Sequence, residues 1–108
     1  MNDDAKLAAL IEKDIMSFED VSRFPGIGLS GNIQRVMGRD VPENGIRILA
    51  EEDGITINCE LIVYFGVNIP QLCYDIQTKV KHDVEKLTGL DVKAINITID
   101  GIDKRQDK

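Results

Sequence analysis

Two cysteines and one histidine are the side chains of this sequence best suited to nucleophilic or metal chemistry. Cys59 and Cys73 are too far apart for a CxxC redox pair or a metal-ligand cluster. Cys59 falls at an apolar strand position without an evident base, and no second histidine accompanies His82 to complete a metal site. The sequence therefore predicts buried, reduced thiols, a solvated histidine and no catalytic residue.

Two further patterns are typical of ligand sites but have simpler structural interpretations. Glu51, Glu52 and Asp53 are three acids in a turn without a ligand-spaced loop, and such acids are usually solvated. The segment from Gly26 to Gly31 satisfies GxGxxG, but it follows Pro25 instead of the strand that a dinucleotide-binding unit requires. We expect no metal and no cofactor.

Length and charge restrict the class of protein. The chain has 108 residues, 43% of them hydrophobic, and a formal net charge of -6. We expect one domain over residues 1–103 and a polar tail over 104–108. The negative charge disfavours binding to phosphate backbones or anionic lipids. Because the chain shows neither a secretion signal nor an apolar run that spans a bilayer, we expect a cytoplasmic protein that reaches the membrane only through a partner.

The elements follow from periodicity. Leu7, Leu10, Ile11 and Ile15 predict a first helix, and a Gly- and Pro-rich connection holds a short helical segment around Ile33, Val36 and Met37. Residues 45–51 and 55–65 form a hairpin, residues 68–89 a long helix, and residues 92–102 a last strand. The predicted class is α/β (α+β), a small mixed three-stranded sheet with two main helices in the order α-(short α)-β-β-α-β.

The long helix has clear start and stop signals. Gly66 permits a sharp exit from the strand, Asn68 is the predicted N-cap, and Pro70 fits the first turn. Gly89 stands where a left-handed residue ends the helix. We interpret this run as a device that sets the angle between strand and helix.

The second face of the sheet is the candidate interaction surface. Ile62 and Tyr64 interrupt the polar face of the long strand, and alternation places Val92, Ala94 and Ile102 on the matching face of the last strand. The long helix should cover the first face, which carries Ile57, Leu61, Ile95, Ile97 and Phe65. Two alternatives remain for the second face: the first helix and the Gly-rich segment cover it, or it stays exposed and binds another copy or a partner.

The order of these motifs resembles a known family. The segments concerned are Val63-Tyr64-Phe65-Gly66-Val67-Asn68-Ile69-Pro70, Thr88-Gly89-Leu90, Ile95-Asn96-Ile97 and Gly101-Ile102. Together they resemble the alkaline shock protein family of bacterial envelope stress response proteins. The resemblance implies a small α/β fold without enzymatic activity, a role in cell-envelope homeostasis as a scaffold, self-association, and for some members recruitment by a membrane-anchor protein.

A nucleic-acid-binding module is the alternative hypothesis. A hairpin, a crossover helix and a strand also occur in KH-like domains, which clamp a nucleic-acid backbone through a GxxG loop. Gly28-Leu29-Ser30-Gly31 has that spacing. Only Arg23 and Arg35 are near it in an acidic chain, so the sequence favours protein partners over nucleic acid.

Overall fold

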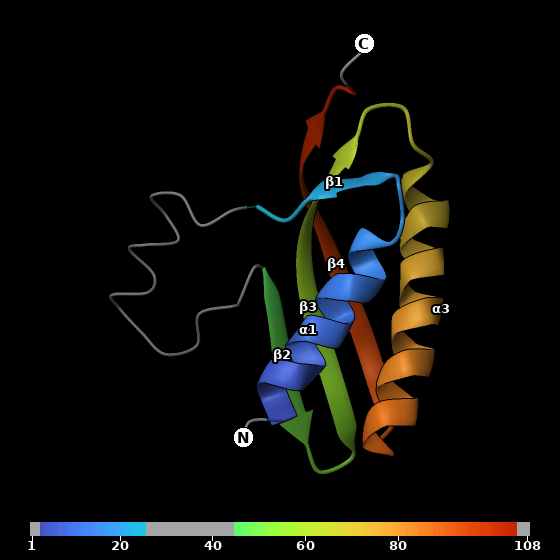
Figure 1. Ribbon diagram of the computed structural model, residues 1–108. Helices are drawn as coiled ribbons and strands as arrows, with labels where there is room; N and C mark the ends of the chain where they lie inside the picture. The colour runs from blue at the N-terminus through green and yellow to red at the C-terminus, as the bar shows by residue number, and fades with distance from the viewer. Residues whose placement is uncertain (1–2, 26–44, 106–108) are drawn as a thin grey trace.

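The computed structural model describes residues 3–25 and 45–105. Their elements, drawn in Figure 1, are α1 (Asp3–Met16), β1 (Val21–Arg23), β2 (Ile46–Glu51), β3 (Gly54–Tyr64), α3 (Ile69–Thr88) and β4 (Val92–Asp103). The α+β class is confirmed. The count of three strands is wrong, because β1 adds a fourth. The glycine motifs and the predicted short helix lie outside the described residues.

The sheet is built on β3. β2 pairs antiparallel with the first half of β3, from Ile46 opposite Cys59 to Glu51 opposite Gly54. β4 runs parallel to nearly the whole of β3, as a strand-helix-strand crossover requires. The short β1 pairs antiparallel with the end of β3, where Val21 is opposite Val63. The sheet is therefore mixed, as predicted.

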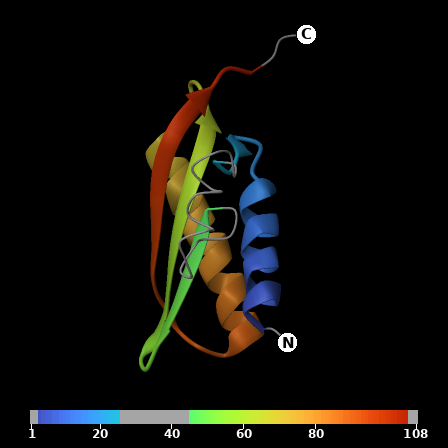
Figure 2. The same cartoon turned by 90° about the vertical axis from the view of Figure 1, so that its left-hand side faces the viewer.

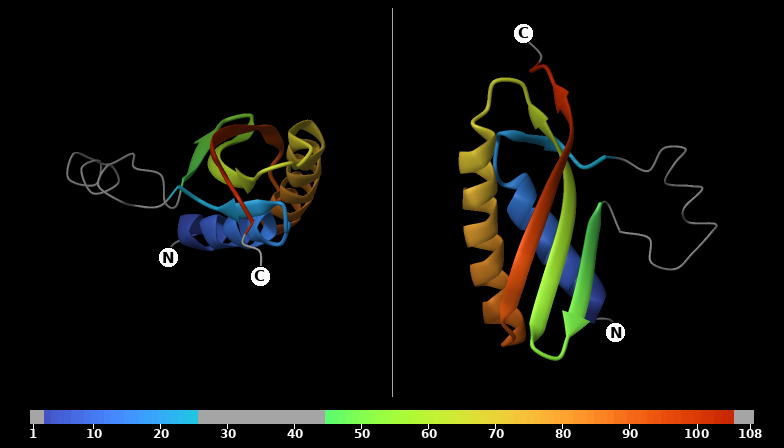
Figure 3. Two further views of the ribbon diagram at one scale, coloured as in Figure 1. Left: turned by 90° about the horizontal axis from the view of Figure 1, so that it is seen from above. Right: turned by 180° about the vertical axis from the view of Figure 1, so that it is seen from behind.

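Both helices lie on one side of the sheet, as Figure 2 and the right-hand view of Figure 3 show. α1 packs against α3 as well as against β1 and β2. The prediction that the first helix covers the second face is therefore wrong, whereas the Gly-rich segment lies outside the described residues. We call the side that carries neither α1 nor α3 the open face; its central residues are Arg47, Thr56, Asn58, Glu60, Asn96 and Thr98.

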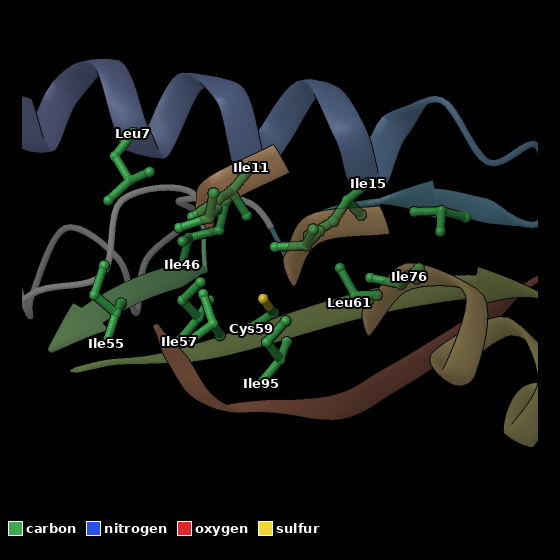
Figure 4. Packing of buried hydrophobic residues seen from close by; sticks show 14 of the residues in the cluster. Leu7, Ile11, Ile15, Ile46, Ile55, Ile57, Cys59, Leu61, Ile76 and Ile95 are labelled. Atoms are coloured by element: carbon green, nitrogen blue, oxygen red, sulfur yellow. The ribbon is translucent and has the colours of Figure 1, made fainter. Parts of the chain in front are cut away.

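The core lies between the helices and the other side of the sheet. Ile11 and Ile15 of α1 point toward the strands in Figure 4, and Ile57 and Leu61 of β3 meet them from below. Burial of each such aliphatic side chain contributes about 1.5–3 kcal/mol before chain entropy is subtracted. The spacing of the apolar residues therefore accounts for the helices and for one face of the sheet.

Candidate interaction surface

The connection from β3 to α3 is fixed by local hydrogen bonds. Gly66 has a φ of 90°, in the region that favours glycine. Asn68 is extended, with φ -81° and ψ 96°, and its side-chain oxygen accepts the N–H of Gln71. That bond is 3.1 Å long. Pro70 stands in the first turn, where no N–H is required. The helix begins where the sequence predicts.

The far end of α3 is equally well defined. Gly89 adopts the left-handed conformation with φ 74° and donates its N–H to the carbonyl of Glu85. The Glu85 carboxylate accepts the N–H of Val92 at 2.9 Å and the Lys81 ammonium at 2.8 Å. The first residue of β4 is thus tied directly to the last turn of the helix. The lowered pKa of Glu85 follows mainly from the hydrogen bond with Lys81.

The Asn68 cap yields a stability prediction. Replacing Asn68 by alanine leaves the Gln71 N–H without its acceptor, so we expect the free energy of unfolding to fall by about 0.5–2 kcal/mol. Urea denaturation measures the change. Asn68→Ser keeps an acceptor and should restore most of the loss. Equal midpoints for the wild type and the alanine variant would show that the cap does not stabilise α3.

The open face is a polar surface around Asn96. The Asn96 amide donates to the side-chain oxygen of Asn58 across the two central strands, at 2.8 Å. A shallow hollow of about 220 Å³ is lined by this pair together with Gly45, Arg47, Cys59, Glu60 and Thr98. Partial desolvation and a hydrogen bond shared with Asp100 raise the pKa of the Glu60 carboxyl, against the effect of Arg47. The face therefore offers both hydrogen-bond donors and hydrogen-bond acceptors.

The five candidate interface residues are not brought together. β4 pairs Val92 with Ile55 and Ile102 with Val63, on the helix side, whereas Ala94 pairs with Thr56 on the open face. The register of β4 against β3 shifts once at Lys93 and once at Asp100, and these two shifts interrupt the alternation of its side chains. Each irregularity of this kind moves the following side chains to the other face. The assumption of one matching face for Val92, Ala94 and Ile102 was therefore wrong.

Ile62 and Tyr64 do lie on the open-face side of β3, but the protein itself covers them. Ile62 is buried, and a Cβ on Gly101 of β4 would lie 3.7 Å from it. The Arg105 guanidinium lies 4.2 Å from the centre of the Tyr64 ring. Arg105 also pairs with Asp20 at 3.4 Å. Most of the apolar surface that motivated the candidate interface is thus used within the molecule.

A different pair of apolar side chains is exposed, at the end of the sheet. Phe65 is 73% exposed and Ile102 is 56% exposed. The N–H of Phe65 donates to the carbonyl of Asp103, next to Ile102. We call Phe65 and Ile102 the sheet tip. The expectation that Phe65 faces the core was wrong, because β3 ends at Tyr64 and the chain turns at Gly66.

The side chains suited to covalent chemistry lie apart from each other. Cys59 is buried and its burial raises the thiol pKa to about 12; Cys73 is half-buried, which corrects the prediction of two buried thiols. His82 is largely exposed beside Asp83. The turn acids Glu51 and Asp53 both pair with Lys93. Over residues 3–25 and 45–105, no group of three potential metal ligands occurs.

The fold and its β3–α3 connection define a small α+β protein without a recognisable reaction centre in its described part. A family model matches residues 4–104 with the description alkaline shock protein 23 family, cell envelope-related function. The chain belongs to this family, so the resemblance carried by the motifs is confirmed. Within the described residues, no helix is both long enough and apolar enough to cross a membrane.

Two relatives come from Bacillus subtilis (strain 168). The uncharacterized protein YqhY is 31% identical over 84 residues, which is 78% of this chain and 62% of the relative. The uncharacterized protein YloU is 27% identical over 74 residues, or 68% of this chain and 62% of the relative. This chain thus matches less than two thirds of the length of either relative. No solved structure matches it.

Proposed function

We propose that this protein is a non-enzymatic scaffold in cell-envelope homeostasis, and that it binds copies of itself and a membrane-anchored partner. The family supports the cellular setting. The net charge of -6 supports the need for a partner, because anionic membrane surfaces repel an acidic protein. The high pKa of the buried Cys59 thiol supports a role without nucleophilic catalysis.

The observation that carries the proposal is the outer edge of β4. Within the described residues, β4 pairs only with β3. A sheet edge presents backbone N–H and C=O groups that a second strand can bond. The carbonyls of Val92 and Ile95 already accept hydrogen bonds from Lys81 and Gln77 of α3. The later part of β4, which leads to the sheet tip, receives no such bonds from α3 in the described part of the chain.

The sheet tip adds apolar area to this edge. Ile97 and Ile99 are half-buried on β4, and Ile102 and Phe65 continue the apolar side chains to the end of the sheet. A second copy that paired with this part of β4 would extend the sheet and cover these side chains. Backbone pairing supplies most of such a contact, and the apolar side chains fix its position.

Sedimentation velocity over a range of concentrations tests the proposal. We expect the wild type to associate, and the double variant Phe65→Lys, Ile102→Lys to stay monomeric, because two charges at the sheet tip oppose association. Tyr74→Lys, Leu87→Lys is the matched control, since Tyr74 and Leu87 are 64% and 56% exposed on α3. A wild type that is monomeric throughout, or a control that dissociates equally, would contradict a self-contact at this edge.

A further inference from the structure

One carboxyl group is buried between the two helices. Asp14 is only 4% exposed, and its neighbours along α1 include the fully buried Ile11 and Ile15. Among the described residues, its Oδ2 atom has no hydrogen-bond partner. A buried carboxylate with an unpaired oxygen is unfavourable, so this position favours the neutral acid.

The partner of Asp14 is a second acid on the facing helix. The Asp14 carboxyl lies near the carboxyl of Asp83 on α3, close enough for the two acids to share a hydrogen bond and to shift each other's pKa. Two carboxyl groups can form this bond only when one of them holds a proton. Asp83 also contacts the His82 ring at 3.1 Å, and it is the more exposed acid of the pair. The proton therefore belongs on Asp14.

Besides the His82 ring, which acts on Asp83, the other charges acting on this pair are two lysines. Lys79 of α3 and Lys13 of α1 favour the ionised form of Asp14, but their effect is smaller than those of burial and of Asp83. The charged residues of the two strands that also contact α1 are Arg23 of β1 and Arg47 and Glu51 of β2, and none of them is among the groups acting on Asp14. The contact therefore depends mainly on one proton.

We propose that the proton shared by Asp14 and Asp83 controls how firmly α1 docks on α3. With the proton present, the two acids join the helices by a hydrogen bond. Without it, two negative charges face each other and one of them is buried. Loss of the proton would loosen α1 and expose the apolar surface of Leu7, Ile11 and Ile15. This control is independent of the function proposed above.

The sign of the effect follows from the direction of the shift. Burial and the Asp83 bond raise the pKa of Asp14 from 3.8 to about 6. When α1 is released, Asp14 returns toward its ordinary value. The docked form is therefore fully favoured below pH 3.8, weakens as the pH rises, and changes little above pH 6. The equilibrium constant for α1 opening should rise about 10- to 100-fold across this window.

Native-state amide hydrogen exchange of α1 tests this proposal at pH 4.5 and pH 7, with each rate divided by its intrinsic value. In the wild type, the protection of α1 should fall more than that of α3 as the pH rises. In Asp14→Asn, the amide donates to Asp83 at both pH values, so α1 should stay protected. Asp91→Asn changes an exposed acid outside this contact and should behave as the wild type.

A titration of the wild type gives a second measurement that does not depend on a variant folding. The side-chain carbonyl carbon of Asp14, followed by NMR, should titrate with a midpoint near pH 6. A midpoint below pH 4.5 would overturn the proposal. So would an Asp14→Asn variant whose α1 loses protection with pH as the wild type does.

Discussion

Gly54→Ala is expected to lower the free energy of unfolding by about 3–5 kcal/mol. Gly54 has a φ of 146°, and a Cβ there would lie 2.6 Å from the carbonyl oxygen of Asp91. That oxygen is held in place, because it accepts a hydrogen bond from the N–H of Ile55 at 2.8 Å. The substitution therefore combines backbone strain with a collision at the point where the β2–β3 hairpin meets the start of β4.

Gly66→Ala separates these two contributions. Gly66 also has a positive φ, of 90°, but no described residue apart from its chain neighbours comes within 4 Å of the position of an added Cβ. Only the conformational cost of about 1–2 kcal/mol should remain. Urea denaturation of the two variants in parallel gives the comparison. If both variants lost the same free energy of unfolding, the close approach of Gly54 to Asp91 would not constrain the fold.

Ile11→Ala is expected to destabilise the protein by about 2–5 kcal/mol, the usual range for a cavity in a packed core. Ile11 is 0% exposed, and in Figure 4 its side chain points from α1 toward the strands. The large value depends on α1 sharing the core with α3 and the sheet. If α1 docked only through its ends, the substitution would lower the free energy of unfolding by much less.

Met16→Ala is the control for this prediction. Met16 stands at the end of the same helix and is 41% exposed, so its truncation should cost less than about 1 kcal/mol. The measurement is again the denaturation midpoint, with the slope used to confirm that both variants unfold as the wild type does. If Ile11→Ala and Met16→Ala lowered the free energy of unfolding equally, α1 would not contribute to the core as described.

Local sequence signals were sufficient to predict α1, α3 and most of the strands. Asn68, Pro70 and Gly89 mark the limits of α3 by their own backbone preferences, which need no tertiary contact. Alternation along β3 correctly assigned Ile57 and Leu61 to the core. β1 could not be predicted in this way, because a three-residue strand exists only through its pairing with β3.

The candidate surface was predicted less well, and for identifiable reasons. Alternation assumes a regular strand, whereas β4 has two register shifts that exchange its faces. Phe65 fitted the apolar pattern of β3 but follows the last residue of that strand. The sequence does contain a pattern that indicates a buried Asp14, since this residue stands at helical spacing from Leu7 and Ile11. A polar residue within an apolar stripe indicates a buried group that needs a partner.

The sequence by itself determined the family, the α+β class and the ends of α3, because these depend on short runs of residues and on the period of the apolar positions. Only the tertiary structure decided that both helices share one face and that Arg105 covers Tyr64. It also placed Asp14 near Asp83, and the backbone of Phe65 against that of Asp103. These pairs are far apart in the chain, and periodicity within one element carries no information about which other element packs against it.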